Sequence, residues 1–547
     1  MKNCIVVFII LILVLQFSAI KSQEYYWVAF TDKKNTPYSL SAPEEYLSER
    51  AIQRRGKQNI AIDSLDLPVS PEYVSQVIRP GVALVHSSKW LNGITVKVEI
   101  DSFENKISPL AFVKEIQLTK PGKITKSGFD KFYEPSGEDP APIDTSVYGY
   151  SVYQVGQLNG QFLHNQGFRG EEKHIAVLDG GFFNADSLGA FDSLWLNNQI
   201  LGTKDFVNAD KPFFKTDYHG MSVLSCMGGN VPGDLMGTAP KASYWLIRSE
   251  DTGSEYIIEE DNWIAAAEFA DSAGVDVINS SLGYSTFNDT TTNHTYSDMD
   301  GKTTRVTRGA NVAALRGMLV FSSAGNEGNK KWKYIIAPSD GDNVIGVGAV
   351  NNDGIAASFT SYGPASDGDI KPNVAGCGVN TFLQKSSGLL GYSDGTSFSS
   401  PVVAGMGACL WQANPHATAA QVKSAIEQSG HLFGSPDSLL GYGIPDMYTA
   451  NLILMNLSAN RMDIQKQWTV YPNPVEDELV LQKIGAQNRA EVKLSFFSVD
   501  GRLLMDETRY ETSKIVVRGL QFLPAGLFIL KIETGNTSES FKLSKSR

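Results

Sequence analysis

The feature that most constrains the fold is an alternation of strand-like and helix-like segments through the centre of the chain. Largely apolar runs at 174–178, 275–279 and 318–321 are typical of buried strands, and the stretch 370–374 is also strand-like. Segments 221–227 and 255–272 have the spacing of helices that pack along one face. Strands that alternate with helices form a parallel sheet covered by helices. The sequence therefore predicts an α/β domain built as a three-layer, doubly wound parallel sheet.

Polar residues stand at the ends of several of these segments. Asp179 closes the strand-like run 174–178, where ligand chemistry gathers in open α/β sheets. His219 precedes the helical segment 221–227, and Asn326 follows a strand-like run. Ser397 lies in Gly-Thr-Ser-Phe-Ser-Ser-Pro, which leads into a helical segment of small and apolar residues. Taken singly, these residues are weak signals of function and are better explained as turn formers or helix caps.

A serine hydroxyl is a weak nucleophile, so chemistry at Ser397 would require a base, an orienter for the base and an oxyanion donor. His219, Asp179 and Asn326 are candidates for these roles. A helix that begins near Pro401 would direct its positive end towards a developing oxyanion.

Together these stretches resemble the subtilisin-like serine proteases, the subtilases, over roughly residues 148–455. Five motifs carry the resemblance in the family's order: Ala-Val-Leu-Asp-Gly-Gly at 176–181, His-Gly at 219–220, Asn-Ser-Ser-Leu-Gly at 279–283, Ser-Ala-Gly-Asn-Glu-Gly at 323–328 and Gly-Thr-Ser-Phe-Ser-Ser-Pro at 395–401.

The resemblance implies a serine endopeptidase that hydrolyses peptide bonds of proteins through an acyl-enzyme intermediate. Ser397 would be the nucleophile, His219 the base, Asp179 its orienter and Asn326 the oxyanion donor. No cofactor is needed for this chemistry. The resemblance also assigns the binding of an extended substrate peptide to five backbone positions: Ser281, Leu282, Gly283, Ala324 and Gly325. Ile336 would line the pocket beneath the scissile residue and favour an apolar side chain there.

The chain departs from the commonest family pattern at two motifs. Asp179 is followed by Gly180 and Gly181 instead of Thr-Gly or Ser-Gly, which removes a hydroxyl that could support the aspartate. His219-Gly220 continues with Met-Ser instead of Thr-His. A catalytically weak or inactive surface-binding protein with the subtilase fold is therefore the alternative, and the intact set of four site residues favours the enzyme.

The N-terminal region has the features of an export signal and a propeptide. Residues 1–22 combine a short charged head, an apolar run and a small-residue exit, which is typical of a signal peptide, with a membrane anchor as the alternative. Residues 23–121 predict a small α+β domain with a helix at 43–55. The domain is similar to inhibitor-type subtilase propeptides, and an independent module is the alternative. Residues 122–147 predict an exposed processing linker. The protease would then be made as a self-processed zymogen.

The C-terminal region predicts a second type of domain. After a catalytic domain at 148–457 and a polar join at 458–467, residues 468–547 contain short strands and regular turn signals, which predict a small β-sandwich. Tyr-Pro-Asn-Pro at 471–474 and the strands near the end resemble the sorting domains of the Bacteroidetes type IX secretion pathway. This implies the secretion machinery as a partner and a secreted or outer-membrane surface location in a Gram-negative bacterium. A carbohydrate-binding sandwich is the alternative. The sequence shows no evident aromatic platform for a sugar, since Trp468 stands alone near the start of the domain.

Charge, cysteines and acidic loops add further expectations. The net charge of -12 argues against a nucleic-acid partner. After removal of the signal, Cys226, Cys377 and Cys409 remain, and we expect buried free thiols without a metal site.

The loop 289–301 carries three aspartates that could bind calcium, or that simply form a solvated acidic loop: Asp289, Asp298 and Asp300.

Overall fold

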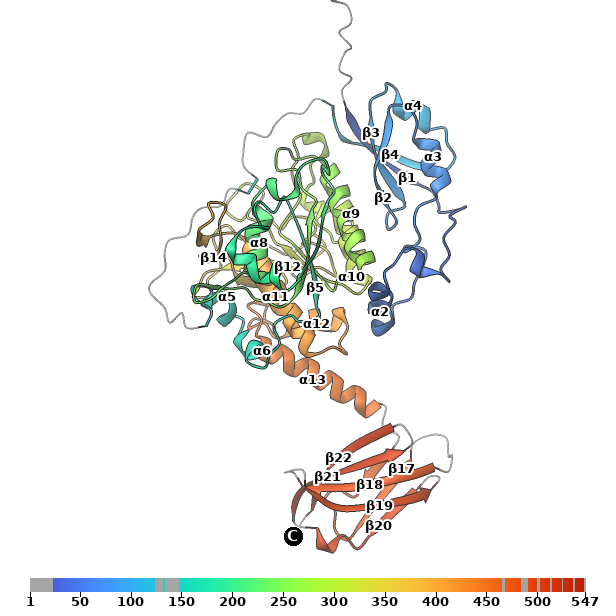
Figure 1. Cartoon of the computed structure of the whole chain (residues 1–547), viewed down its shortest axis with the longest axis vertical. Helices are drawn as coiled ribbons and strands as arrows, with labels where there is room; N and C mark the ends of the chain where they lie inside the picture. The colour runs from blue at the N-terminus through green and yellow to red at the C-terminus, as the bar shows by residue number, and fades with distance from the viewer. Residues whose placement is uncertain are drawn as a thin grey trace, which may run out of the picture. The chain divides into compact units, whose positions relative to one another are not determined.

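The computed structural model describes residues 23–122, 131–132, 147–464, 468–483, 490–498, 502–511, 514–523, 525–534 and 537–545. The expected signal peptide at 1–22 and most of the expected linker lie outside the described residues. The chain divides into two compact units, Met1–Leu454 and Met455–Arg547 (Figure 1). Among the helices of the described ranges, none is both long and apolar enough to cross a membrane.

A seven-stranded parallel sheet forms the centre of the first unit, in the order β13-β12-β11-β10-β5-β9-β6. On one side of β5 the chain passes to the edge strand β6 and returns to β9, which lies between them; on the other side it continues from β10 outward to β13. This arrangement confirms the predicted doubly wound sheet. The strands are β5 (His174–Asp179), β6 (Ile200–Asp205), β9 (Ser243–Arg248), β10 (Val277–Ser280), β11 (Leu319–Ser323), β12 (Ile345–Val350) and β13 (Val374–Cys377).

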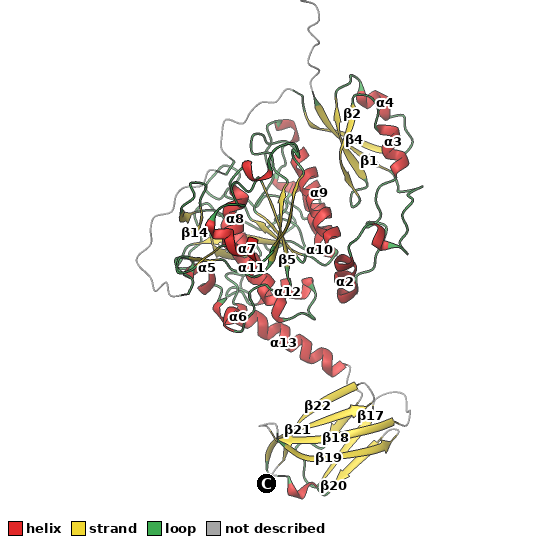
Figure 2. Cartoon of the chain, viewed as in Figure 1, coloured by secondary structure: helices red, strands yellow, loops and turns green. Residues whose placement is uncertain are grey.

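Helices cover both faces of this sheet and make the expected three layers (Figure 2). Alternate residues of β5 enter different cores: Ile175 and Val177 pack with α8 and α11, whereas Ala176 and Leu178 pack with α9 and α10. The helices of the unit are α5 (Val152–Gly156), α6 (Gln161–Asn165), α7 (Asp192–Leu196), α8 (His219–Gly228), α9 (Ile258–Ala273), α10 (Arg305–Leu315), α11 (Thr396–Ala413) and α12 (Ala419–Gln428). A further helix, α13 (Met447–Ile464), contains the boundary between the two units.

The structure differs from the sequence prediction at one strand and at one hairpin. The strand expected at 370–374 begins only at Val374, because Pro372 has no N–H to donate to a ladder and Lys371 instead turns inward to donate to the carbonyls of Gly341 and Val344. A hairpin of β14 (Thr381–Gln384) and β15 (Leu390–Ser393) precedes α11 and was not predicted.

The N-terminal domain is the predicted α+β unit, with an antiparallel sheet in the order β2-β3-β1-β4. The helix expected at 43–55 is split in two, because the Ser48 hydroxyl accepts a bond from the Ala51 N–H and starts a new helix there. The elements are β1 (Glu24–Phe30), η1 (Pro43–Glu45), α2 (Glu49–Gln58), α3 (Pro71–Val77), β2 (Val82–Ser88), β3 (Gly93–Val98), α4 (Phe103–Ile107) and β4 (Val113–Lys120).

The second unit contains two antiparallel sheets, β16-β17-β20 and β19-β18-β21-β22, as predicted for a β-sandwich. Trp468 is 1% exposed and belongs to its core, so this side chain offers no aromatic platform to a carbohydrate. The strands of the second unit are β16 (Trp468–Tyr471), β17 (Glu478–Lys483), β18 (Ala490–Ser498), β19 (Leu503–Glu511), β20 (Lys514–Arg518), β21 (Gly526–Thr534) and β22 (Thr537–Lys545).

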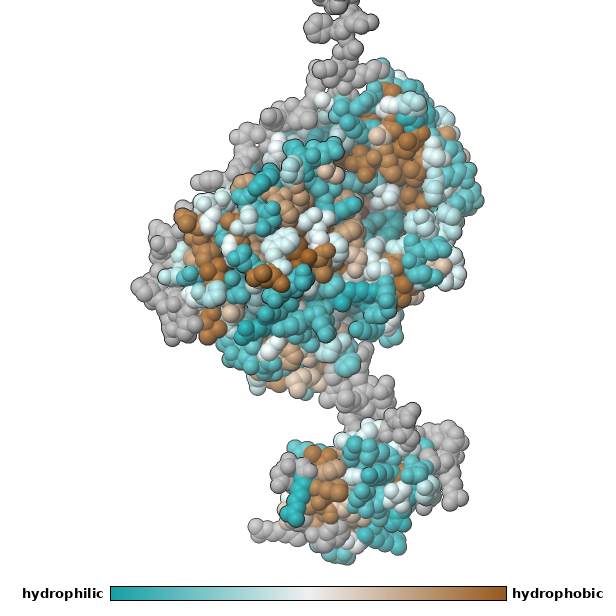
Figure 3. All heavy atoms as spheres, viewed as in Figure 1, coloured by the Kyte–Doolittle hydropathy of each residue, from teal (hydrophilic) through white to brown (hydrophobic). Residues whose placement is uncertain are grey.

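Figure 3 shows hydrophilic residues over much of the visible face of the chain, interspersed with smaller hydrophobic groups.

Candidate active site

Asp179 and His219 meet where β5 ends and α8 begins. The Nδ1 atom of His219 lies 2.7 Å from Oδ1 of Asp179, and both side chains are buried. Gly220 permits this approach, because a Cβ there would lie 2.6 Å from the Gly181 carbonyl oxygen and 2.7 Å from Cβ of Asp179. Asp217 accepts a bond from the His219 backbone N–H and holds the start of the helix. The structure thus places the expected base and its orienter in direct contact.

The departure from the family pattern after Asp179 has a visible consequence. Oδ1 accepts from the Gly180 N–H at 2.7 Å as well as facing His219, whereas Oδ2 is buried without a hydrogen-bond partner among the described residues. Burial raises the pKa of Asp179, while His219 and the Gly180 N–H oppose that rise. The missing hydroxyl leaves one carboxylate oxygen unsupported but does not displace Asp179 from His219.

Ser397 and Asn326 are held together at the start of α11. The amide oxygen of Asn326 accepts from the Thr396 N–H at 2.9 Å and from the Thr396 hydroxyl at 2.8 Å. These bonds fix the amide plane through its oxygen, so the NH₂ group remains to donate. Ser281 donates from its hydroxyl to the Ser397 carbonyl oxygen at 2.7 Å, and Ser397 is 6% exposed.

The two pairs lie in one site, because α8 and α11 pack on the same face of the sheet. The ring of Phe398, the neighbour of Ser397, has its centroid 6.1 Å from that of His219. A cleft beside the serine is lined by Asn326, Gly395 and Phe359, among other residues. The structure therefore brings Asp179, His219, Asn326 and the Ser397 segment to the carboxyl edge of the parallel sheet.

The expected substrate-binding segments follow β10 and β11. Ile336 packs between them, since a Cβ on Gly283 would lie 2.2 Å from its Cδ1 atom and a Cβ on Gly325 would lie 2.9 Å from it. Tyr284 donates its backbone N–H to the Ala337 carbonyl at 2.8 Å and ties the Ile336 loop to the first segment. Ile336 thus lies against Gly283 and Gly325, where an apolar lining was expected.

The linker contributes a residue that the sequence reasoning missed. The ring of Phe132 stacks on the imidazole of His219, with centroids 3.9 Å apart and planes 15° apart. The linker composition predicted an exposed segment, and only the unusual apolar content of Phe-Asp-Lys-Phe-Tyr at 129–133 could have signalled burial. In this state the expected catalytic histidine is covered by the chain's own linker.

The N-terminal domain packs against α9 through buried charges. Glu268 accepts from the backbone N–H groups of Lys89 and Trp90 at 2.8 and 3.1 Å. Asp271 lies 2.5 Å from Arg54 and 3.0 Å from Lys89. Burial alone would raise the pKa of Asp271, but these cations and Arg55 hold it well below its usual range. The two domains are therefore joined by a desolvated ionic network.

The aspartates of the loop 289–301 do not form a common site. Asp289 caps a short helix by accepting from Thr291, Asp298 forms a capping box with Thr295, and Asp300 accepts from Lys302 and Thr303. Among the described residues, the acidic or metal-ligating side chains close enough to share an ion are instead Glu250, Glu255 and Glu259. The structure thus supports the reading of 289–301 as an acidic loop held by local turns.

The three cysteines of the mature chain are buried, as expected. None of Cys226, Cys377 and Cys409 forms a disulfide with another. Burial raises the pKa of Cys377 to about 12, so this thiol stays protonated and behaves as a small apolar group.

Comparison with known families decides the assignment. The model of the subtilase family matches residues 170–443. The chain belongs to the subtilase family. The flanks match two further models: the peptidase S8 propeptide domain of Bacteroidota at residues 25–131 and a secretion system C-terminal sorting domain at residues 469–546. The subtilase is therefore a secreted serine protease made with a propeptide, and its sorting domain marks it for type IX export or cell-surface attachment in Bacteroidetes.

Curated relatives agree with this assignment. Subtilisin NAT of Bacillus subtilis subsp. natto and Subtilisin E of Bacillus subtilis (strain 168) are each 31% identical over 294 residues, which cover 53% of this chain and 68% of theirs. Among solved structures, MycP1 from Mycobacterium smegmatis matches with 19% identity and a TM-score of 0.46, over 59% of this chain and 89% of that one. Nothing in these comparisons favours the inactive alternative.

Proposed function

We propose that this subtilase is a serine endopeptidase that acts through Ser397, His219 and Asp179. The single observation that carries the proposal is the buried contact of 2.7 Å between His219 Nδ1 and Asp179 Oδ1, next to a serine at the start of a helix. The remaining ring nitrogen, Nε2, is the atom that would exchange protons with Ser397.

In the proposed mechanism, Ser397 Oγ attacks the scissile carbonyl while His219 Nε2 takes its proton. His219 then returns the proton to the leaving amine, and an acyl-enzyme remains for water to hydrolyse. Asp179 holds the imidazole with Nδ1 protonated and stabilises the imidazolium. The burial of Asp179 strengthens this electrostatic effect, because water does not screen it.

Asn326 would donate its NH₂ group to the tetrahedral oxyanion, together with the Ser397 backbone N–H. The orientation of the amide is supported by the two bonds from Thr396 to its oxygen. The N-terminus of the 18-residue α11 adds a positive potential at the same place. Such donors stabilise the transition state more than the ground state, because they are aimed at charge that develops only during attack.

Substrate peptides would pair in extended form with Ser281, Leu282 and Gly283 on one side and with Ala324 and Gly325 near the scissile residue. Main-chain pairing positions the bond whatever the side chains are. No cofactor enters these steps, and a structural calcium ion could add stability without taking part in them.

The stacking of Phe132 on His219 supports a zymogen in which the linker blocks the histidine. Cleavage between residues 122 and 147 would free the site, and the mature enzyme would act on proteins outside the cell. The sorting domain would engage the type IX secretion machinery during export.

The test compares the full chain with a Ser397→Ala twin. We expect the wild type to process itself on a gel, to hydrolyse casein and to be labelled by a serine-reactive fluorophosphonate, and the twin to lose all three. N-terminal sequencing of the mature form would locate the processing site. A folded wild type that neither labels nor hydrolyses would overturn the assignment of the triad.

A further inference from the structure

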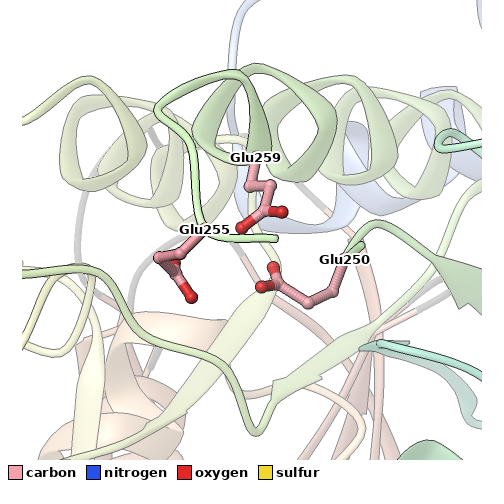
Figure 4. Close-up of side chains that lie close together, drawn as sticks. All are labelled: Glu250, Glu255 and Glu259. Atoms are coloured by element: carbon pink, nitrogen blue, oxygen red, sulfur yellow. The ribbon is translucent and has the colours of Figure 1, made fainter. Parts of the chain in front are cut away.

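Three glutamates form a pocket near the candidate active site. Glu250 lies in the loop after β9, and Glu255 and Glu259 lie before and within the first turn of α9. One carboxylate oxygen of each lies within 4.8 Å of the others. Figure 4 shows the three side chains directed towards one another. We call this set the glutamate pocket.

The ammonium group of Lys131, from the propeptide linker, occupies the glutamate pocket. Its Nζ lies 2.7 Å from Glu255 and 2.7 Å from Glu259, and it also contacts Glu250. The lysine side chain is only 6% exposed. Burial by itself would lower the pKa of Lys131, but the three carboxylates raise it well above its usual value. A lysine is therefore bound here as a fully charged, desolvated ligand.

Without such a cation, the buried carboxylates of the glutamate pocket would lack a counter-charge. Glu259 is 1% exposed, and its Oε1 has no hydrogen-bond partner among the described residues even with the lysine present. The Tyr284 hydroxyl donates to Glu250 at 2.9 Å but carries no charge. An ammonium offers three donors to three carboxylates, whereas calcium normally takes six to eight oxygens. The chemistry of the pocket thus fits a basic side chain.

The next residue of the linker connects this pocket to the catalytic histidine. Phe132 directly follows Lys131 and stacks on His219. Gly180 makes room for the ring, because a Cβ there would lie 2.8 Å from Phe132 and 2.7 Å from Thr252. The Asp-Gly-Gly departure from the family pattern therefore creates space for a large side chain beside His219. The linker enters the site as a lysine followed by an aromatic residue.

We propose that the glutamate pocket is a specificity subsite that binds a basic side chain of the substrate, above all lysine, while the following aromatic residue lies on His219 over Gly180. Lys131 and Phe132 occupy these two places in the zymogen as a built-in substrate mimic. Processing of the linker empties both places for substrates. This inference rests on the proposed endopeptidase function and names the sequence that it selects.

The first test uses the self-processed wild-type enzyme and a proteome-derived peptide library, with cleavage products read by mass spectrometry. We expect lysine and arginine to be enriched at one position and aromatic residues at the next. A synthetic peptide with the best-cleaved sequence is then compared with its lysine-to-norleucine analogue, which keeps the four-carbon stem of the side chain and removes the charged ammonium group. We expect kcat/KM to fall at least 10-fold for the analogue.

The second test removes charge from the pocket. Glu255→Gln and Glu259→Gln, singly and together, should lower kcat/KM for the lysine peptide at least 10-fold and leave the norleucine peptide within about twofold. Asp210→Asn, at an exposed aspartate, is the matched control and should change neither value. Equal rates of fluorophosphonate labelling would verify that each variant keeps an intact nucleophile.

The outcomes separate the two proposals. A wild type that labels and cleaves without any basic preference would overturn the subsite and leave the endopeptidase standing. A basic preference that survives the double variant would also overturn it. A wild type that neither labels nor cleaves would overturn the proposed function and the subsite with it. Because the norleucine comparison uses the wild type alone, it can overturn the subsite even if the variants fold poorly.

Discussion

Phe132 lies nearly parallel to the imidazole of His219, with ring centroids 3.9 Å apart. The two residues are 87 positions apart in the sequence, since 219 minus 132 is 87. The Phe132 ring covers one face of the His219 imidazole, whose Nε2 atom exchanges protons in the proposed mechanism. In the proposed zymogen, this contact would link the block of the site directly to His219, the proposed base.

Replacing Phe132 should weaken this block. In Phe132→Ala the linker loses the stacked ring, so unprocessed zymogen should be labelled by fluorophosphonate several-fold faster than the wild type. Labelling is measured in the first minutes, before cleavage of the linker is seen on a gel. Leu389→Ala, at an exposed apolar residue of the turn between β14 and β15, is the control and should not differ from the wild type. Equal labelling of Phe132→Ala and the wild type would show that the ring does not block the site.

The role of Asn326 can be separated from its structural bonds. Asn326→Asp keeps an oxygen for the two bonds from Thr396 but removes the NH₂ donor. We expect kcat to fall by about 10²–10³, as for the corresponding donor of subtilisin, with KM and the melting temperature little changed. A loss confined to KM or to stability would contradict the assignment of Asn326 to the oxyanion.

Gly180 should control the size of the side chain that lies on His219. In Gly180→Ala the new methyl group meets Phe132 at 2.8 Å and Thr252 at 2.7 Å, so the site becomes shallower. Cleavage of substrates with an aromatic residue at this position should drop at least fivefold, while substrates with alanine there should be cleaved as before. Gly180→Ala combined with Thr252→Ser should recover part of the loss. An unchanged aromatic preference would place the aromatic residue elsewhere.

Docking of the propeptide should depend on Asp271. The carboxylate lies 2.5 Å from Arg54 and 3.0 Å from both Arg55 and Lys89, all of them buried. Asp271→Asn would remove the counter-charge that Arg54 and Lys89 share, whereas Arg55 would keep Asp66, and we expect a cost of about 3–5 kcal/mol. In the Ser397→Ala background, which cannot process, the melting temperature should fall by several degrees. Asp210→Asn should leave it unchanged.

The basic preference should increase with pH. Burial, with repulsion from Glu250, raises the pKa of Glu255 to about 7 although Lys131 lowers it, and burial raises that of Glu259 as well. A raised carboxyl pKa means that the pocket gains protons and loses negative charge as pH falls. In the proposed processing, Lys131 leaves with the linker, and the pocket then loses the cation that lowers these pKa values. The ratio of kcat/KM for lysine and norleucine peptides should therefore rise from pH 6 to pH 9.

A ratio that is constant over this range would mean that the carboxylates do not titrate there. The norleucine peptide is the internal control, because its pH profile contains every other contribution of the enzyme but no charge-charge interaction with the pocket. Tyr284, the remaining polar group on Glu250, has its pKa raised well above 10 by burial and by the glutamates, so it stays protonated.

Much of the fold could be predicted because local patterns of apolar and polar residues specify its strands and helices. Apolar runs such as 174–178 predict buried strands, and their alternation with helices specifies a parallel sheet whose carboxyl edge collects the site. His219 at a helix start and Asn326 after a strand are found where the motifs placed them. The strand expected at 370–374 begins later, because Pro372 has no N–H to donate and the side chain of Lys371 is buried against the Gly341 carbonyl. A contact with a residue 30 positions away is not visible in the local sequence.

The sequence by itself determined the three-domain order, the choice of the four proposed site residues and the absence of a hydroxyl after Asp179. Only the tertiary structure decided what that absence does. Gly180 leaves one oxygen of Asp179 unsupported and at the same time opens room for Phe132 on His219. Glu250, Glu255 and Glu259 look in the sequence like ordinary surface charges of a loop and a helix start. They become a pocket because folding buries their carboxylates together, and a desolvated cluster of like charges requires a cation.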